Sequence, residues 1–393
     1  MVTSGQINFH YYYGTSPTAA EDSLILTGDN YTDLIMANMI AGVMYGHLIT
    51  ELTPGMQFSD DYLYGSIFGQ LLQENIATEY YASGSPLLDP SPDQQAVMGT
   101  GQGGPYQINN YAADMVAGTY APQGFSLINY VALQKNIGFT MSNAATQYTN
   151  ATPPSFNSKY YGPMLTAYFH FNDYKALQYI GSASLTTPWS PGSASWTPSW
   201  QPYFSQSLSS FQSLPGSQLD ILLNIAYNAG YYAQLFVDKT KASANSTATT
   251  VASFNSFTNA WGGDSYHQYP YQVRGYLDQL YDIATPNSND LNTIVTPNNH
   301  VAFNLGALSG VFSDVFQTLA YVDGSGNYSF ITDAQATAAF ASAVSGEGLG
   351  NSATLDLSNA PDRAKIFRIL NTAISNLEKN LNTSFSATTL QQL

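Results

Sequence analysis

The positions of apolar residues along the chain predict a mostly helical protein. In several segments an apolar residue recurs at every third or fourth position, which is the period of a helix with one buried face. The predicted helices cover residues 32–49, 62–81, 109–116, 124–136, 164–179, 219–237, 271–283, 333–344 and 360–381. The Ser-Asp-Asp run at 59–61 is typical of a helix start, and it places the beginning of the second helix there.

The segments between these helices predict loops and one β-hairpin. Residues 1–20 have no helical period and predict an irregular lead-in. Residues 83–105 are rich in Gly, Pro, Ser and Asp, and loops of that length are usually functional or disordered. In residues 321–331 an Asp-Gly-Ser-Gly-Asn run lies between aromatic flanks, which predicts a β-hairpin. The expected fold is therefore mostly α, with one β-hairpin.

The charge balance argues against two classes of partner. The 393 residues hold 26 Asp+Glu and 10 Lys+Arg, which gives a formal net charge of −16 at pH 7. Binding to nucleic acid or to an anionic membrane surface needs clustered Lys and Arg, so neither partner is expected. The most apolar run, residues 34–49, is interrupted by Asn38, Gly42, Gly46 and His47, and we expect no transmembrane helix. The chain has no Cys, which excludes disulfides and thiolate metal sites.

The sparse charge also predicts where the protein works. Only 9% of the residues are charged, so Ser, Thr, Asn, Gln and Tyr should dominate the surface. Acid unfolds proteins mainly by protonating carboxylates that are paired in the native state, and this chain has few of them. We therefore expect an extracellular or periplasmic protein that works at acidic pH, with its signal peptide absent from this chain. The alternative is a compositional bias of the source genome.

Four short motifs follow one another along the chain. They are Gln-Glu-Asn at 73–75, Gly-Gly-Pro-Tyr-Gln-Ile-Asn at 103–109, Ala-Tyr-Asn-Ala-Gly at 226–230 and Tyr-Pro-Tyr-Gln-Val-Arg at 269–274. This series resembles the lysozyme-like superfamily, which includes soluble lytic transglycosylases and goose-type lysozymes. The resemblance spans about residues 60–285, and the motif at 226–230 is its most specific part.

The resemblance implies a domain organisation and a set of site residues. It implies a lysozyme-like helical catalytic domain at residues 55–285, after an N-terminal lead-in and helix at 1–54. A helical C-terminal extension at 286–393 would pack on that domain. The resemblance makes Glu74 the catalytic acid and assigns substrate binding to Tyr106, Gln107, Tyr227 and Asn228. For Asn228, together with Gly230, fixing a close packing of helices is favoured over contact with substrate, and for Tyr227 packing in the core is the alternative.

The sequence departs from the family pattern in three ways. Asn75 follows the acid where the family usually has Ser, and residues 82–103 form an insertion. The tail after Tyr281 is also extra. These departures bear on the substrate more than on the class of reaction.

The residues themselves agree with glycosidic bond cleavage. That reaction needs an acid to protonate the leaving oxygen, and a carboxyl does so near neutral pH only where desolvation raises its pKa. Glu74 is the one charged residue between positions 63 and 77, and it lies beside Phe68, Leu71 and Leu72 in the sequence. The alternative is that Glu74 is a solvated residue on a helix face.

The sequence leaves open which residue supplies the second catalytic carboxylate. Asp89 and Asp93 lie in the long loop, where either could activate water, and Glu79 is a further candidate. Each is otherwise a turn or cap residue. By the resemblance, a lytic transglycosylase would need no such base, because the N-acetyl group of the sugar assists.

Aromatic residues could hold a glycan, whereas metal ligands are not evident. Trp189 and Trp196 are candidate platforms for sugar rings, together with Trp200, Tyr203 and Tyr161, although most aromatic residues should be core. The five histidines, at 10, 47, 170, 267 and 300, show no ligand spacing, so we expect no metal site and no cofactor. Asp323 begins a run like a calcium loop, but Ala334 replaces the closing Glu, which favours a hairpin turn.

These observations favour a monomeric, secreted glycoside hydrolase. Peptidoglycan is anionic and should repel a chain with a net charge of −16, whereas a neutral polysaccharide should not. We therefore expect an endo-acting enzyme on the β-1,4 linkages of cellulose, another β-glucan or chitin. One alternative is a peptidoglycan lytic transglycosylase or lysozyme. The other is a non-catalytic carbohydrate-binding protein on the same fold.

Overall fold

The computed structural model describes two main parts of the chain and several short pieces. The described residues are 7–11, 22–26, 29–53, 60–76, 102–103, 108–109, 265–286, 294–295, 297–322, 325 and 328–385, with single positions at 160, 163, 164, 166–168, 170, 171, 174 and 224. These residues are mostly helical, and their strands form short two-stranded antiparallel pairs. The predicted mostly α class is thus confirmed at that level.

Helix α1 (Asp29–Leu52) lies at the centre of the described residues and packs against α2 (Asp60–Ile76). Its side chains are buried along nearly its whole length, from Thr32 to Ile49. The glycines that interrupt its apolar run make the close contact: a Cβ on Gly42 would lie 1.9 Å from the backbone oxygen of Tyr64. Gly42 therefore lets the two backbones approach each other.

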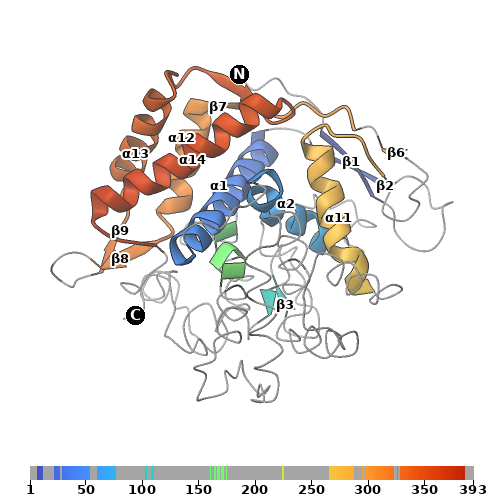
Figure 1. The fold of residues 1–393 in the computed structure, drawn as a ribbon, viewed down its shortest axis with the longest axis horizontal. Helices are drawn as coiled ribbons and strands as arrows, with labels where there is room; N and C mark the ends of the chain where they lie inside the picture. The colour runs from blue at the N-terminus through green and yellow to red at the C-terminus, as the bar shows by residue number, and fades with distance from the viewer. Residues whose placement is uncertain are drawn as a thin grey trace, which may run out of the picture.

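Helix α11 (Ser265–Leu280) packs on α2 by the same means. A Cβ on Gly65 would lie 2.7 Å from a methyl of Leu277, and one on Gly69 would lie 2.7 Å from a methyl of Val273. In Figure 1, α11 (yellow) lies beside α2 on the side away from the C-terminal helices. The predicted helix at 271–283 is thus confirmed, and it begins earlier than the periodicity indicated.

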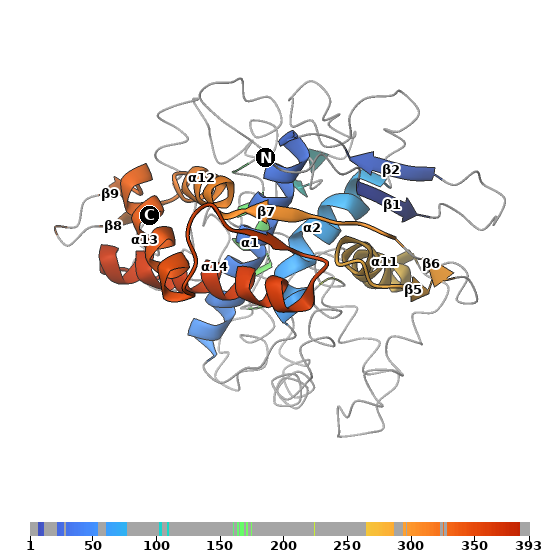
Figure 2. The ribbon, with the colours of Figure 1, turned by 90° about the horizontal axis from the view of Figure 1, so that it is seen from above.

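Three helices complete the described core on the other side of α1. They are α12 (Leu305–Phe316), α13 (Asp333–Gly346) and α14 (Ala360–Leu381), and α12 and α14 both contact α1 (Figures 1 and 2). The apolar face predicted for 360–381 is fully buried. Asn304 caps α12, and Thr332 forms a capping box with Gln335 at the start of α13. Helix α14 begins at its Asn359 cap and ends at Asn382, which has a left-handed backbone.

The strands among the described residues form five antiparallel pairs. They are β1 (Ile7–Tyr11) with β2 (Asp22–Leu26), β3 (Gln102–Gly103) with β4 (Ile108–Asn109), β5 (Thr285–Pro286) with β6 (Ile294–Val295), β7 (Ala302–Asn304) with β10 (Thr354–Asp356), and β8 (Ala320–Val322) with β9 (Tyr328–Phe330). The pairing of β8 with β9 confirms the predicted hairpin.

Two predictions about local structure are wrong. The lead-in at 1–20 was expected to be irregular, but Ile7–Tyr11 forms a strand that pairs with β2. Its residues are β-branched or aromatic at Ile7, Phe9 and Tyr11, which suits a strand. The helix expected from Asn109 does not begin there, because Asn109 pairs with Gln102 across β3 and β4.

Several predicted elements fall largely outside the described residues. In the segments 164–179 and 219–237, the described positions are helical, including His170 and Asn224. The segments 110–116 and 124–136 lie outside the described residues, as does the stretch 77–81 at the end of the second predicted helix. The domain boundaries at 54 and 285 stay a prediction.

Helix α1 is also long and apolar enough, over Thr32–Leu52, to cross a membrane by length and composition. No transmembrane helix was expected from the sequence, because polar residues and glycines interrupt the run. Within the protein, 89% of the most apolar window is buried, so core packing also accounts for its composition.

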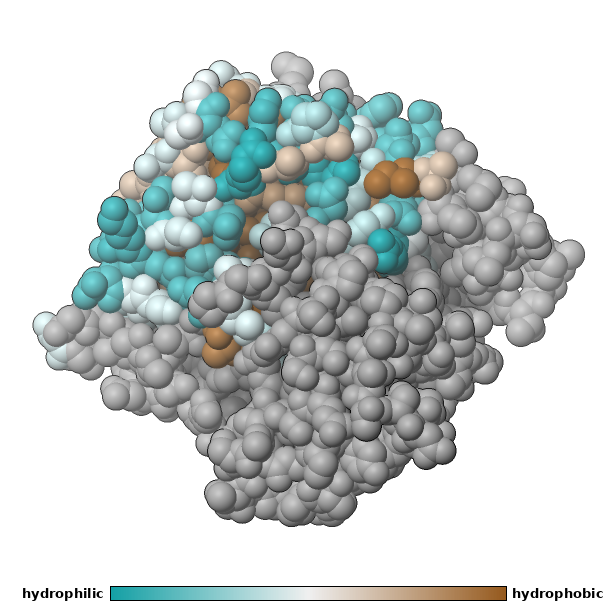
Figure 3. Space-filling view, viewed as in Figure 1, coloured by the Kyte–Doolittle hydropathy of each residue, from teal (hydrophilic) through white to brown (hydrophobic). Residues whose placement is uncertain are grey.

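The described part of the face in Figure 3 is mostly hydrophilic, with small hydrophobic areas. Leu52 and Ile283 are exposed apolar residues.

Candidate functional site

A buried polar network surrounds Gln70 on α2. The Gln70 side chain is fully buried, and its Nε2 donates a hydrogen bond to Asn224 Oδ1 at 2.7 Å. The Gln70 Oε1 accepts a hydrogen bond from Nε2 of His170 at 2.5 Å. Asn224 and His170 are each 1% exposed. A single amide thus joins α2 to two segments that lie 100 and 154 positions further along the chain.

Burial sets the charge state of this network. The pKa of His170 is lowered to about 3 because burial disfavours the imidazolium form. The ring of Tyr45, on α1, lies 5.3 Å from the His170 ring, centroid to centroid. His170 is therefore neutral at any pH well above 3, with its Nε2 proton directed at Gln70.

The network lies close in sequence to two of the predicted motifs. Gln70 precedes Glu74 by four residues on α2, so both belong to one face of that helix. Asn224 precedes Tyr227 by three residues and Asn228 by four, in the predicted helix at 219–237. The bond from Gln70 to Asn224 therefore joins the helix of the first motif to the segment of the third.

The fourth motif also reaches α2. Val273 is buried at the close contact with Gly69, which is the residue next to Gln70. The guanidinium of Arg274 lies 4.0 Å from the centre of the Tyr62 ring, at the start of α2. The first motif thus lies on α2, and the fourth motif and Asn224, two residues before the third motif, contact the same helix.

The predicted site side chains themselves are not among those described. The backbone of Glu74 lies in the last turn of α2, and its side chain is outside the described set. The remaining predicted catalytic and substrate-binding residues lie outside the described residues: Asp89, Asp93, Tyr106, Gln107, Trp189, Trp196, Tyr227 and Asn228. Strands β3 and β4 flank residues 104–107 of the second motif.

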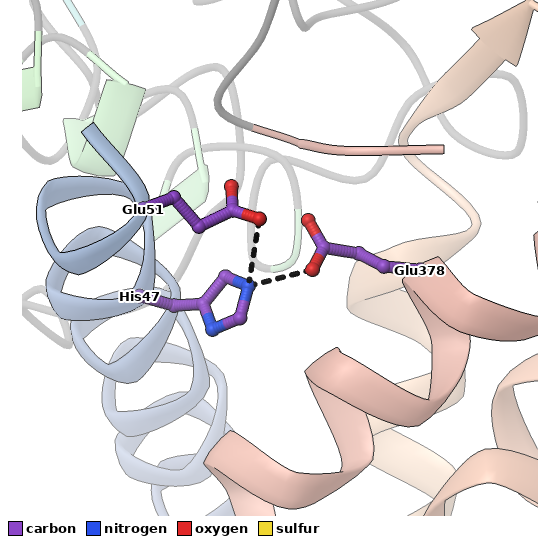
Figure 4. A group of neighbouring side chains, drawn as sticks. All are labelled: His47, Glu51 and Glu378. Carbon is purple, nitrogen blue, oxygen red and sulfur yellow. Dashed lines mark hydrogen bonds and ion pairs between the residues drawn. The ribbon is translucent and has the colours of Figure 1, made fainter. Parts of the chain in front are cut away.

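A second polar cluster joins α1 to α14 (Figure 4). Nε2 of His47 lies 2.8 Å from Oε2 of Glu378 and 3.7 Å from Oε1 of Glu51. His47 and Glu51 are four residues apart on α1, so both point to the same side of it, and Glu378 approaches from α14. The side chains of His47 and Glu378 are each 10% exposed, and that of Glu51 is 25% exposed.

Three further groups hold the cluster from behind. Asn371 Oδ1 lies 3.2 Å from Nδ1 of His47. The backbone N–H of Phe385 donates to Oε1 of Glu378 at 2.6 Å, and Ser384 Oγ donates to Oε2 of Glu51 at 3.1 Å. The oxygen of each carboxylate that does not face His47 is thus hydrogen-bonded, which fixes the direction of the other oxygen.

The two carboxylates dominate the electrostatics of this cluster. Burial acts to lower the pKa of His47, but the hydrogen bond and charge of Glu378, with the charge of Glu51, outweigh it and raise that pKa above its ordinary value. Tyr168 belongs to the same environment. Its pKa is raised well above the usual range, first by burial and then by the charges of Glu378 and Glu51.

Neither cluster was predicted from the sequence. The histidines were interpreted as scattered without ligand spacing, whereas the structure brings the ligand atoms of His47, Glu51 and Glu378 within 4.8 Å of one another. The spacing of His47 and Glu51 on one helix was a visible signal. The contribution of Glu378, 331 positions from His47, was not.

Comparison with protein families, with curated proteins and with solved structures found no match to this chain. The lysozyme-like resemblance therefore rests on the four motifs alone.

Proposed function

We propose that this chain is a glycoside hydrolase that cleaves internal β-1,4 linkages of a neutral polysaccharide, with Glu74 as the general acid. The hydrogen bond from Gln70 to Asn224 carries the proposal. It joins α2, four residues before Glu74, to Asn224, three residues before Tyr227 in the sequence. This bond supports the proposal because a shared cleft would need the helix of Glu74 and the segment of Tyr227, 153 residues further along the chain, to lie together.

The surroundings of α2 favour an acid with a raised pKa. The side chains of α2 from Leu63 to Leu72 are buried and carry no charge, and α11 covers the same helix at Gly65 and Gly69. A carboxyl group that continues such a face loses water, which disfavours its charged form and raises its pKa. Glu74 would then hold its proton near neutral pH and deliver it to the leaving oxygen.

The water-activating group would come from the long loop. An inverting hydrolase needs its two carboxyls about 6.5–9.5 Å apart, with water between them. Asp89 or Asp93 would be that base, and the product of a β-linked substrate would be the α-anomer. Trp189 and Trp196 would stack on the sugar rings. The net charge of −16 favours a neutral polymer over anionic peptidoglycan.

The first experiment tests the acid. Wild type and Glu74→Gln are assayed for reducing-sugar release from cellulose, chitin and peptidoglycan between about pH 3 and 7. We expect about a thousand-fold loss of turnover, because an amide cannot donate the proton. Glu347→Gln, in an exposed ion pair with Arg368, is the matched control and should keep full activity. If Glu74→Gln keeps more than about a tenth of the activity, the assignment of Glu74 is wrong.

The second experiment tests the base and the product. NMR during early hydrolysis should show the α-anomer, and either Asp89→Asn or Asp93→Asn should abolish hydrolysis. A 1,6-anhydro product from an N-acetylated substrate would instead identify a lytic transglycosylase. Binding to a polysaccharide without any product would identify a carbohydrate-binding protein.

A further inference from the structure

His47, Glu51 and Glu378 have the arrangement of a metal centre. The ligand atoms of an imidazole and two carboxylates lie within 4.8 Å of one another, and in Figure 4 all three side chains point to one place between α1 and α14. We propose that these residues bind one divalent transition-metal ion of the Zn²⁺ class, which ties α1 to α14. The proposal is independent of the glycosidase function.

The distances suit such an ion. Zinc binds imidazole nitrogen at about 2.0–2.1 Å and carboxylate oxygen at about 2.0–2.2 Å, so neighbouring ligand atoms of a tetrahedral site lie roughly 3.3–3.5 Å apart. The separations from His47 Nε2 to the two carboxylates are 2.8 Å and 3.7 Å, on either side of that value. Small rotations of the Glu51 and Glu378 side chains would bring both oxygens to the ligand distance.

The groups behind the ligands orient them. A metal-binding histidine usually donates its other ring N–H to an oxygen, which leaves the ligating nitrogen with a free lone pair. The carbonyl oxygen of Asn371 lies at Nδ1 of His47, so Nε2 faces the two carboxylates. Ser384 and the backbone of Phe385 hold the outer oxygens of Glu51 and Glu378. Each ligand thus has a hydrogen-bond partner on the side away from the other two ligands.

The charge and the ligand types select the ion. Two carboxylates with a neutral imidazole carry a charge of −2, which a divalent cation neutralises. An imidazole ligand suits Zn²⁺ and its neighbours in the first transition row, whereas Ca²⁺ and Mg²⁺ prefer sites made of oxygen alone. With three protein ligands, the fourth position would hold water. The competing account is a plain ion pair between protonated His47 and the carboxylates, without a metal.

The experiment uses the full chain, treated with EDTA and then dialysed against Zn²⁺. We expect retained zinc in a 1:1 ratio by elemental analysis, and a rise in Tm of about 5 °C at saturating Zn²⁺. Cobalt should give the intense visible absorption of a tetrahedral site, and Ca²⁺ or Mg²⁺ should give neither effect. Glu51→Gln should weaken Zn²⁺ binding at least about tenfold.

Glu51 is the ligand of choice for substitution because it is the most exposed of the three, so the variant should fold. His47→Gln is the second variant. His300→Gln is the matched control, since His300 is exposed and lies 3.7 Å from Asp356 in another His–carboxylate pair. Zinc binding that Glu51→Gln and His47→Gln leave unchanged would overturn the proposal. So would a wild type that binds no zinc, and the cluster would then be an ion pair only.

Discussion

His47 and His170 lie in the same helical core and have opposite electrostatic surroundings. His47 faces two carboxylates between α1 and α14, and its pKa is raised. His170 faces the neutral amide of Gln70 next to α2, and its pKa is lowered to about 3. Burial disfavours the imidazolium form at both positions, so the partner, not the depth, decides the direction in which the pKa is shifted.

The contributions of the two histidines to the free energy of unfolding therefore change with pH in opposite directions. The pKa of His170 is lower in the folded chain, so the unfolded chain binds the proton first, and stability falls as the pH drops below about 6.5. His47 has a raised pKa, so its contribution is full below about 6.5 and is lost as the pH rises through the folded pKa. Together they favour a stability maximum near the ordinary pKa of histidine.

The largest expected effect is the loss of stability in acid. The difference between 6.5 and about 3 corresponds to roughly 4–5 kcal/mol at about 1.4 kcal/mol per pH unit. Denaturant unfolding at several pH values from 3 to 7 measures it, in EDTA so that no metal contributes. His170→Gln should remove most of this slope, because Gln does not titrate in that range. An unchanged slope in the variant would show that other groups cause the acid loss.

This prediction bears on the expected acidic working range. The low charge of the sequence indicated a protein with little to lose in acid, and a buried neutral histidine opposes that. If the protein is acid-stable all the same, the roughly 4–5 kcal/mol must be offset by the core elsewhere.

The second effect comes from removing the neutral partner. Gln70→Leu leaves both Asn224 and His170 without their bond to this side chain, and a buried polar group that loses its partner costs about 1–3 kcal/mol. We expect a loss of about 3 kcal/mol in the free energy of unfolding at pH 7, measured with denaturant. Gln317→Leu is the control, because the exposed Gln317 side chain donates its hydrogen bond to Ser313 at the end of the same helix, and the substitution should cost less than about 0.5 kcal/mol.

Equal losses in the two glutamine variants would contradict the importance of the Gln70 network. A large loss of stability for Gln70→Leu alone would also support the importance of the contact between α2 and Asn224, on which the proposed cleft depends.

The third prediction exchanges the partners of the two histidines. Gln70→Glu should raise the pKa of His170 by at least about one unit, and Glu378→Gln should lower the pKa of His47, because the charge that favours its imidazolium form is removed. The two substitutions are nearly isosteric, so the change is mainly in charge. NMR titration of the imidazole protons in the two variants measures both pKa values. Shifts in the same direction in both variants would show that the partners do not decide the charge.

The helices of this fold could be predicted because each buries a face that repeats along the sequence. The face of α14, from Ile366 to Leu377, is a direct example. Helix α12 was not predicted as a separate element, because Gly and Ser residues at 306, 309, 310 and 313 dilute its period. Strand β1 was missed because its partner, β2, lies beyond residues with no hairpin signal.

The polar clusters could not be predicted, for a different reason. Each depends on contacts between residues far apart in sequence, such as Glu378 with His47 and Asn224 with Gln70. No local pattern reports such a contact, and only the i, i+4 pair of His47 and Glu51 left a trace. The motif residues of the proposed active site are visible in the sequence, yet their chemistry depends on the same kind of long-range contact.

The smallest effect concerns the group behind Glu51. Ser384→Ala removes the hydrogen bond to Oε2 of Glu51, which should cost about 1 kcal/mol in metal-free protein. Ser375→Ala is the control, since the hydroxyl of exposed Ser375 donates to the backbone oxygen of Asn371 on its own helix, and the substitution should be near neutral. The two variants are compared by denaturant unfolding with EDTA present.

The same variant separates an ion pair from a metal centre. Orienting groups behind a ligand usually contribute about 10–100-fold to metal affinity, far more than their effect on stability implies. Ser384→Ala should therefore lower Zn²⁺ affinity at least about tenfold in a calorimetric titration, while Ser375→Ala should leave it unchanged. If Ser384→Ala changes only the metal-free stability, Glu51 is held for its contact with His47, and the difference between the two histidines is one of ion pairing alone.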